Sequence, residues 1–441
     1  PRRQGRARAR RAGRRRRARR GARRSWSCAG AASRISPPAP ARRRAASTLA
    51  TSLARRASAG RIPATTLAAA TCSSFGPAAA RALWTRQAAR LASTSPSATR
   101  CPSSRRTMTT EANALRARGL AAAITAAAPG GSVSHHWQPP AKHDVDWLLR
   151  ASRDRLAKLP NVVHVDDPKR LTVVGDVHGQ LFDVLELLGS RGPPSSTNAF
   201  LFNGDLVDRG LFGAEITILL FALALADPHS VFINRGNHES RAMTQAYGFR
   251  NEVLFKYGAE TYDLFQQAFD CLPLGTVVKH RDIRALVLHG GLFTDPSINL
   301  ESLDGVDRVT EPTREGVVHD VLWSDPGRKP GRHINRARGA GLMFGPDVTQ
   351  DFLTANNLDL IVRSHQVREA GYSIEHNGRL VTIFSAPHYC GGYNAGAVLT
   401  FDESDQRPSI EQFTAVEGAP GVAWLRQVYS HQREQLSKSR L

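Results

Sequence analysis

Acidic residues are missing from the first quarter of this chain, and that absence decides how its charge is interpreted. Residues 1–107 contain 27 Arg but no Lys, Asp or Glu, and the first acidic side chain is Glu111. The formal net charge of the whole chain is +22, so residues 108–441 hold five more acidic than basic side chains. All the excess positive charge lies in the N-terminal segment. The overall basicity therefore gives no reason to expect nucleic-acid binding by the rest of the chain.

The sequence is also poor in cysteine and has no long apolar run. Of its five Cys, only Cys271 and Cys390 lie beyond residue 107, and no CxxC pair occurs. This excludes a disulfide framework and a thiolate-rich zinc site, and it predicts a reducing compartment. The most apolar run, 216–226, is too short to span roughly 30 Å of hydrocarbon. It predicts a buried helix, and no membrane insertion is expected.

Residues 1–107 are predicted to be disordered, because Arg, Ala, Ser and Pro with few aliphatic side chains cannot bury a core. Three interpretations stay open: a transit peptide, a basic tail that contacts nucleic acid or anionic surfaces, and translated GC-rich sequence upstream of a true start codon. The interpretation as translated upstream sequence is considered because the chain begins with Pro and its first Met is Met108. The expected location is the cytoplasm or nucleus, or an organelle if the segment is a transit peptide.

A regular series of short apolar runs, each followed by a polar motif, begins after residue 160. The runs 171–174, 200–203, 231–234, 285–288, 360–362 and 381–384 lead into GDVHG, GDLVDRG, RGNHE, HGG, RSHQ and SAPHYC. Helical patterns separate several of these runs, and an amphipathic helix is expected over 144–159. Strands that alternate with helices predict an α/β domain. Because ligands gather beyond the carboxyl ends of strands in open α/β sheets, the polar clusters predict one shared site.

The donor groups in these clusters are oxygen and imidazole. The set of three imidazoles, two carboxylates and one amide comprises Asp176, His178, Asp205, Asn237, His289 and His365. Without a thiolate it suits manganese, iron or zinc ions rather than a structural zinc site. Six ligands are too many for one four-coordinate ion, and they suit two metals about 3.5–4 Å apart that share a carboxylate. Two such cations acidify a bridging water, which predicts a metal-dependent phosphoester hydrolase.

The ordered motifs resemble those of the phosphoprotein phosphatase family of serine/threonine phosphatases, which are calcineurin-like metallophosphoesterases. The similarity covers roughly Leu148 to Phe401, includes VLWSDP and FGPDVTQDFL, and is greatest to the type-5 and type-7 branch. It implies a central β-sandwich of mixed sheets flanked by helices. Four segments follow: the basic segment 1–107, a linker with weak helix at 108–140, a catalytic domain at 141–405, and a C-terminal tail at 406–441.

The resemblance also implies how the metal-binding residues divide. Asp176 and His178 would bind the first of two divalent ions, and Asp205 would bridge both. The second ion would be bound by Asn237, His289 and His365.

Further roles follow for the residues that act on substrate. Arg209 and Arg363 would hold the phosphate, because planar arginine is a natural phosphate clamp. His238, paired with Asp208, would be the general acid, and Tyr389 would line the site. Asn237 would contact substrate as well as metal, whereas Arg235 is expected to be structural.

The predicted function is hydrolysis of phosphoserine and phosphothreonine in proteins by a metal-activated water. A dinucleoside tetraphosphatase or another phosphoester hydrolase is the alternative, since it shares the GD, GNH and HG clusters; SAPHYC, VLWSDP and DRG count against it. A nucleic-acid-binding protein with a phosphatase-like scaffold is disfavoured by the intact ligands and the acidic domain. Expected partners are phosphoprotein substrates.

The chain departs from the family pattern in three respects. His388 stands where the family usually has Asn, in a loop that is one residue shorter than in type-1 enzymes. The tetratricopeptide repeat of type-5 enzymes has no counterpart in residues 1–140. The calcium-binding loops of related branches are also absent from the sequence.

Overall fold

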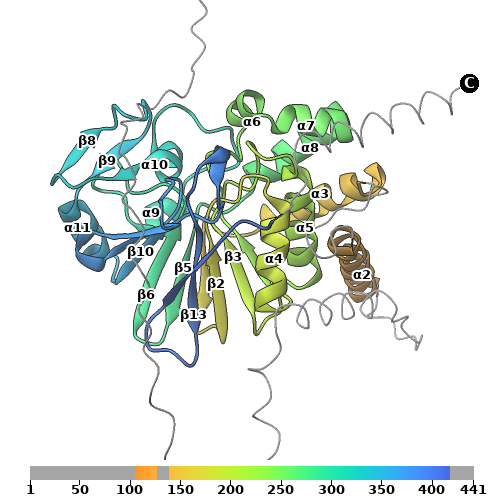
Figure 1. The fold of residues 1–441 in the computed structure, drawn as a ribbon, viewed down its shortest axis with the longest axis horizontal. Coiled ribbons are helices and arrows are strands. Elements are labelled where there is room, and N and C mark those ends of the chain that lie inside the picture. The colour runs from red at the N-terminus through yellow and green to blue at the C-terminus, as the bar shows by residue number, and fades with distance from the viewer. Residues whose placement is uncertain (1–104, 127–138, 418–441) are drawn as a thin grey trace, which may run out of the picture. The chain divides into compact units, whose positions relative to one another are not determined.

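The computed structural model describes residues 105–126 and 139–417, and two large β-sheets form its centre (Figure 1). The five-stranded sheet has the order β14-β13-β2-β3-β4, with strands Ser409–Phe413, Gly396–Asp402, Arg170–Val174, Ala199–Phe202 and Val231–Ile233. The six-stranded sheet has the order β1-β5-β6-β10-β12-β11, with strands Val162–Asp166, Gly275–His280, Ile283–Leu288, Leu360–Arg363, Leu380–Ile383 and Tyr372–Glu375. Both contain parallel and antiparallel pairs. All six predicted apolar runs form strands.

The two sheets pack face to face through a core to which both contribute. Successive side chains of a strand point to opposite faces of the sheet. Val173 of β2 therefore enters the shared core with Val287 of β6 and Val362 of β10. Val174 and Leu288, each one position further along, belong instead to the outer cores beneath the helices. This arrangement confirms the predicted β-sandwich.

Helices cover the outer faces of both sheets (Figure 1). Those in the core cluster of the five-stranded sheet include α3 (Lys142–Leu156), α4 (Leu181–Arg191), α5 (Gly213–Ala226), α7 (Phe249–Lys256) and α8 (Ala259–Asp270). Those beside the six-stranded sheet are α9 (Leu300–Asp304), α10 (Val317–Trp323) and α11 (Pro346–Ala355). The predicted buried helix is α5, in which residues 213–222 are all buried. The predicted amphipathic helix is α3.

The folded region extends beyond the predicted domain boundaries at both ends. Helix α2 (Arg105–Ala126) covers much of the segment predicted as a linker, and its Leu120 and Ile124 are buried in the same core as α5. Small Ala side chains elsewhere on α2 make its hydrophobic periodicity weak, although they allow close packing. At the other end, β14 pairs with β13 and extends the sheet past residue 405. The predictions for residues 1–104 and 418–441 lie outside the described residues.

A small third sheet was not predicted from the sequence. Its order is β7-β9-β8, with strands Asp325–Pro326, Leu342–Phe344 and Arg332–Ile334. Strand β7 begins with Asp325, and the β8–β9 connection carries Arg338. These two residues form an ion pair with Nε to Oδ2 at 2.7 Å. The third sheet therefore holds Arg338 in place through its ion pair with Asp325.

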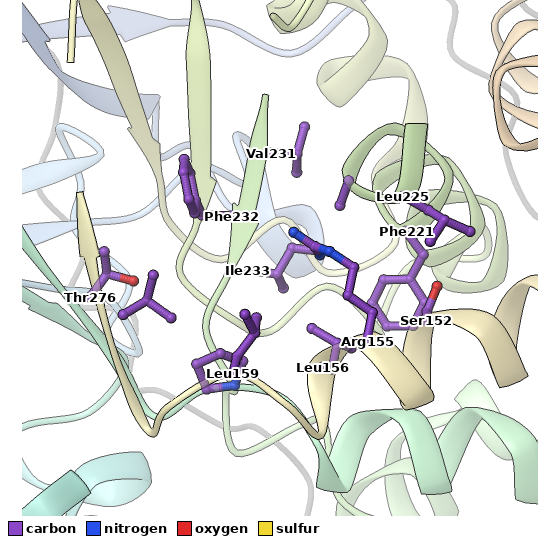
Figure 2. A pocket seen from close by; sticks show the side chains of 13 residues that line it. Ser152, Arg155, Leu156, Leu159, Phe221, Leu225, Val231, Phe232, Ile233 and Thr276 are labelled. Carbon is purple, nitrogen blue, oxygen red and sulfur yellow. The ribbon is translucent and has the colours of Figure 1, made fainter. Parts of the chain in front are cut away.

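An apolar cavity lies between α3, α5 and the edge strand β4 (Figure 2). Figure 2 shows Leu156 of α3 and Phe221 of α5 on one side and Ile233 of β4 on the other. Its volume is about 20 Å³, close to the minimum that holds a single water molecule. The volume excludes it as a site for a phosphoester.

None of the helices in the described ranges is long and apolar enough to cross a membrane.

Candidate active site

Loops that follow six strands bring most of the predicted residues to one place. The ends of β2, β3 and β4 meet those of β6, β10 and β12, so both sheets contribute. One cavity of about 480 Å³ is lined by Asp176, His178, Asp205, Arg209, Asn237, His238, His365 and Tyr389. Asp208, His289 and Arg363 do not line it. A cavity of this volume falls in the range of ordinary small-molecule sites, about 300–1,000 Å³.

Backbone strain is concentrated in these loops. Positive φ angles between 40° and 69° occur at His178, Asp205, Asp208, Arg209 and His365. Such angles are uncommon outside glycine, and they tend to cluster at functional sites because surrounding structure must hold them in place. The sequence could not reveal this, because none of the five is a residue type that requires the conformation.

Two glycines allow the β3 and β4 loops to touch. Gly204 has φ +82°, and a Cβ placed there would lie 2.3 Å from the backbone nitrogen of Gly236. Glu239, which is fully buried, connects the β3 loop to the β4 loop. Its carboxylate accepts hydrogen bonds from the backbone N–H groups of Asp205 at 2.7 Å and Gly236 at 2.9 Å. Sequence reasoning assigned Glu239 no role, although it positions the Asp205 loop.

The protonation state of His289 follows from its hydrogen bonds. Its Nδ1 lies 2.8 Å from the carbonyl oxygen of Asn203, which can only accept, so Nδ1 carries the proton. Burial lowers the pKa of His289 well below its usual value, so the ring is neutral. Its Nε2 is then a bare lone pair, yet it lies 2.9 Å from Asn237 Oδ1 and 3.3 Å from Asp205 Oδ1. Electron-rich atoms converge here, as ligands of a cation do.

The same reasoning applies to His178 on the other side of Asp205. Its Nδ1 lies 2.9 Å from the carbonyl oxygen of Val207, and burial lowers its pKa well below the usual value. Its Nε2 lone pair therefore lies 3.5 Å from Asp205 Oδ2 and 3.8 Å from Asp176 Oδ2. The two oxygens of Asp205 thus approach two different imidazoles. That is the placement a bridging carboxylate needs.

Two further observations fit a pair of cations. Either tautomer of His365 leaves one ring nitrogen unsatisfied, because its Nδ1 lies 3.1 Å from His289 Nε2 and its buried Nε2 has no hydrogen-bond partner among the described residues. Burial raises the pKa of the Asp176 carboxyl to about 7, and burial together with the charge of Asp176 raises that of Asp205 well above its usual value. Positive charge nearby would favour the ionised form of both carboxyl groups. The residues present therefore fit the predicted dinuclear metal site.

His238 is adjacent to this cluster but is held by a different group. Its Nδ1 lies 2.7 Å from Asp208 Oδ2, and the other oxygen of Asp208 accepts the backbone N–H of Phe249 at 2.9 Å. His238 Nε2 is 3.9 Å from Asp205 Oδ2, and the ring lines the cavity. Burial, with Arg209 and Arg338 nearby, lowers the pKa of His238 to about 3. The structure thus brings together the predicted His238–Asp208 pair.

Tyr389 and Arg209 lie at the wall of the cavity. The Tyr389 ring stacks on His178 with ring centroids 4.9 Å apart. The Arg209 guanidinium lies over the ring of Tyr247, 3.9 Å from its centroid. Arg209 is exposed, and no side-chain hydrogen bond or ion pair joins it to any residue in the described ranges, so its N–H donors remain available.

Arg363, predicted as the second phosphate clamp, is instead part of the core. It is fully buried and does not line the cavity. Its Nε donates to the Gly290 carbonyl at 2.6 Å, Nη1 to Gln366 at 3.0 Å, and Nη2 to Asp325 at 3.0 Å. All three nitrogens are occupied by protein acceptors, so the predicted phosphate contact does not fit this geometry. Arg235 is likewise buried and lies outside the cavity lining, as a structural role requires.

Arg338 lies where Arg363 was expected. It lines the cavity, and its Nε and Nη2 bond to Asp325 at 2.7 and 3.1 Å, which leaves Nη1 without a partner among the described residues. Sequence reasoning missed it because RARG follows no apolar run and matches none of the strand-end motifs. Arg338 stands 13 residues after Asp325, and that separation by itself predicts no contact between them.

Comparisons with known proteins agree with this site. The family model described as calcineurin-like phosphoesterase matches residues 169–369. Serine/threonine-protein phosphatase 5 of Solanum lycopersicum is 46% identical over 272 residues, which cover 61% of this chain and 48% of the relative. The human serine/threonine-protein phosphatase 5 is 43% identical over 272 residues, covering 61% of this chain and 54% of the relative. The chain spans about half the length of these curated relatives.

A solved structure shows the same fold. It is a protein serine/threonine phosphatase from Saccharomyces cerevisiae, described as similar to human phosphatase PP5. The TM-score is 0.60 at 37% identity, and the match covers 63% of this chain and 91% of that chain. Residues 169–369, which the family model matches, contain all six predicted metal ligands.

Proposed function

Because the chain belongs to the calcineurin-like metallophosphoesterases, and its relatives of 41–46% identity are serine/threonine protein phosphatases, we propose that it hydrolyses phosphoserine and phosphothreonine in proteins. The observation that carries the proposal is the Asp205 carboxylate, whose two oxygens lie 3.3 and 3.5 Å from two neutral imidazoles. A site of this kind binds two cations around one bridging ligand.

Manganese, iron or zinc are the ions that this donor set suits, because it combines imidazole, carboxylate and amide without thiolate. Asp176, His178 and Asp205 would hold one ion, and Asp205, Asn237, His289 and His365 the other. When bound, the ions supply an acidified water and positive charge for phosphate oxygens. Hydrogen bonds from Nδ1 to the backbone carbonyl groups of Asn203 and Val207 keep His289 and His178 in the tautomer that leaves Nε2 free for a metal ion.

The substrate phosphate would meet the guanidinium groups of Arg209 and Arg338. Both line the cavity and both retain unused donors, and Asp325 fixes the orientation of the second. Asn237 and Tyr389 border the same space. Preorganised donors stabilise charge that moves in the transition state without reorganising.

His238 would deliver the proton that the departing alkoxide needs. A serine alkoxide is strongly basic and leaves poorly without a proton. Asp208 orients the imidazole through Nδ1, so Nε2 serves the substrate. A phosphate dianion in the cavity opposes the effect of the two arginines and favours the protonated ring.

A direct assay tests the proposed function. We expect the full chain, supplied with manganese, to release phosphate from phosphoserine and phosphothreonine peptides with kcat/KM far above that for diadenosine tetraphosphate. Efficient cleavage of the dinucleotide with slow peptide turnover would instead favour the alternative hydrolase.

The two arginines that the structure distinguishes should respond differently to substitution. Arg338→Ala should lower kcat/KM for a phosphopeptide by about 10²–10³-fold, the scale for one lost preorganised donor. It should lower the melting temperature less than the Arg363 variant does, because Asp325 keeps Arg363 and Asn335 as partners. Arg363→Met should instead destabilise the fold by about 3–5 kcal/mol, because it leaves Asp325 and buried carbonyl groups without their partner. Kinetics and thermal unfolding of both variants check this. An Arg363 variant with native stability and no activity would restore it as a phosphate ligand.

A further inference from the structure

A third guanidinium group lines the cavity, and the proposed chemistry does not use it. Arg368 lies in the connection between β10 and β11 and lines the cavity together with Arg209 and Arg338. Only two carboxylates, those of Asp176 and Asp205, share this lining, and both belong to the proposed metal site. Three arginines from three different loops therefore line the cavity, of which Arg338 and Arg368 are each paired with one carboxylate outside the lining.

The hydrogen bonds of Arg368 hold it firmly but leave a donor group unused. Its Nε donates to Ser373 Oγ at 2.7 Å, and its Nη2 donates to Gln366 Oε1 and Glu375 Oε2, both at 2.9 Å. Nη1 has no hydrogen-bond partner among the described residues. A partly exposed ion pair with Glu375 alone would contribute little to stability. Three bonds to Arg368, with 23% of its side chain exposed, instead describe a preorganised fork beside the cavity.

Arg363 provides the contrast within the same loop. Gln366 Oε1 accepts from both Arg363 and Arg368, so the two guanidinium groups are neighbours through one amide. Every nitrogen of Arg363 is occupied and its side chain is fully buried, as expected of a structural arginine. Arg368 combines fixed geometry with a free donor and an open cavity. Arginine in such a position binds carboxylate or phosphate strongly.

We infer that Arg368 binds a second anionic group of the substrate, a carboxylate or a phosphate on a residue beside the phosphorylated one. This inference rests on the proposed phosphopeptide activity and extends it to a substrate class, phosphosites in acidic sequences. Arg209 and Arg338 take the phosphate that is cleaved, and Arg368 takes its anionic neighbour. Arg368 is then a residue of specificity, and its effect falls on substrate binding.

Three peptides and four proteins test the inference. The peptides carry one phosphoserine in a neutral sequence, the same phosphoserine between two glutamates, or the same phosphoserine next to a second one. The proteins are the full chain, Arg368→Gln, Arg368→Lys and the control Arg407→Gln. Arg407 is an exposed arginine of the β13–β14 hairpin, beyond the end of β13 that is remote from Tyr389. Each pair is measured for kcat and KM with manganese at low ionic strength.

We expect the wild-type chain and Arg407→Gln to favour the anionic peptides by about tenfold in kcat/KM, the scale of one charge-assisted hydrogen bond. Arg368→Gln should remove the preference through KM, with a much smaller loss on the neutral peptide. Arg368→Lys should keep part of the preference, and added salt should weaken it. A preference for the doubly phosphorylated peptide alone would identify phosphate as the second group, and a preference for both would identify any anion.

Other outcomes overturn the inference and are distinguishable from failure of the proposed function. Equal kcat/KM on all three peptides in the wild-type chain, or a preference that survives in Arg368→Gln, would refute the role of Arg368 while leaving the phosphatase activity intact. Hydrolysis of none of the peptides would refute the proposed function, and the inference with it.

Discussion

Replacing Asp205 with alanine should lower phosphopeptide kcat by about 10³-fold or more, because the change removes charge stabilisation at the reacting centre. The reason lies in the two oxygens of Asp205, which approach His289 and His178 separately. One substitution therefore disrupts both halves of the metal site. Elemental analysis of the purified protein should show the metal content of the variant well below that of the wild-type chain, which we expect to hold about two ions.

The matched control is Asp351→Ala, which removes an exposed carboxylate of α11 that is not part of the site. It should keep both activity and metal content. Circular dichroism should show that Asp205→Ala remains folded. A wild-type chain that is fully active with well under two metals, or an active Asp205→Ala variant, would contradict the bridging role.

Replacing His238 with asparagine should slow phosphoserine-peptide hydrolysis by about 10²–10⁴-fold, the range of general acid–base catalysis. The same variant should lose much less activity on p-nitrophenyl phosphate, because nitrophenolate is a weak base that departs without a proton. Asp208→Asn should show the same selectivity more mildly, since Asp208 orients His238 through a 2.7 Å contact and donates no proton to substrate. Steady-state kinetics on both substrates measure the difference.

Metal content must be compared in each variant, because His238 follows the proposed ligand Asn237. His229→Asn is the matched control: His229 is exposed and lies at the opposite end of β4 from His238. It should behave as wild type on both substrates. Equal losses on the peptide and on p-nitrophenyl phosphate in His238→Asn would indicate that His238 acts through metal or phosphate binding.

The strands and the metal ligands were predictable because the signals are local. Each ligand stands within four residues of the end of an apolar run, as His289 follows 285–288. A buried strand must end where its polar residues begin. The parallel pairs β2–β3, β3–β4, β6–β10 and β10–β12 then bring the strand ends to the same edge. The weakly periodic α2 and the small third sheet lacked such signals, because Ala-rich and very short elements depend on packing for their stability.

The donor groups of the site were readable from the amino-acid sequence: their types, their positions after apolar runs, and the lack of a thiolate among them. Which arginines line the cavity depends on tertiary contacts instead. Arg363 is the last residue of β10, and its pairing in that strand places its guanidinium in the core, beneath Gly290 and Asp325. Arg338 lies in an irregular connection, and the ion pair to Asp325 places it beside the cavity. The direction of a side chain is set by strand register and by partners that are distant in sequence. Neither can be inferred from a short sequence motif.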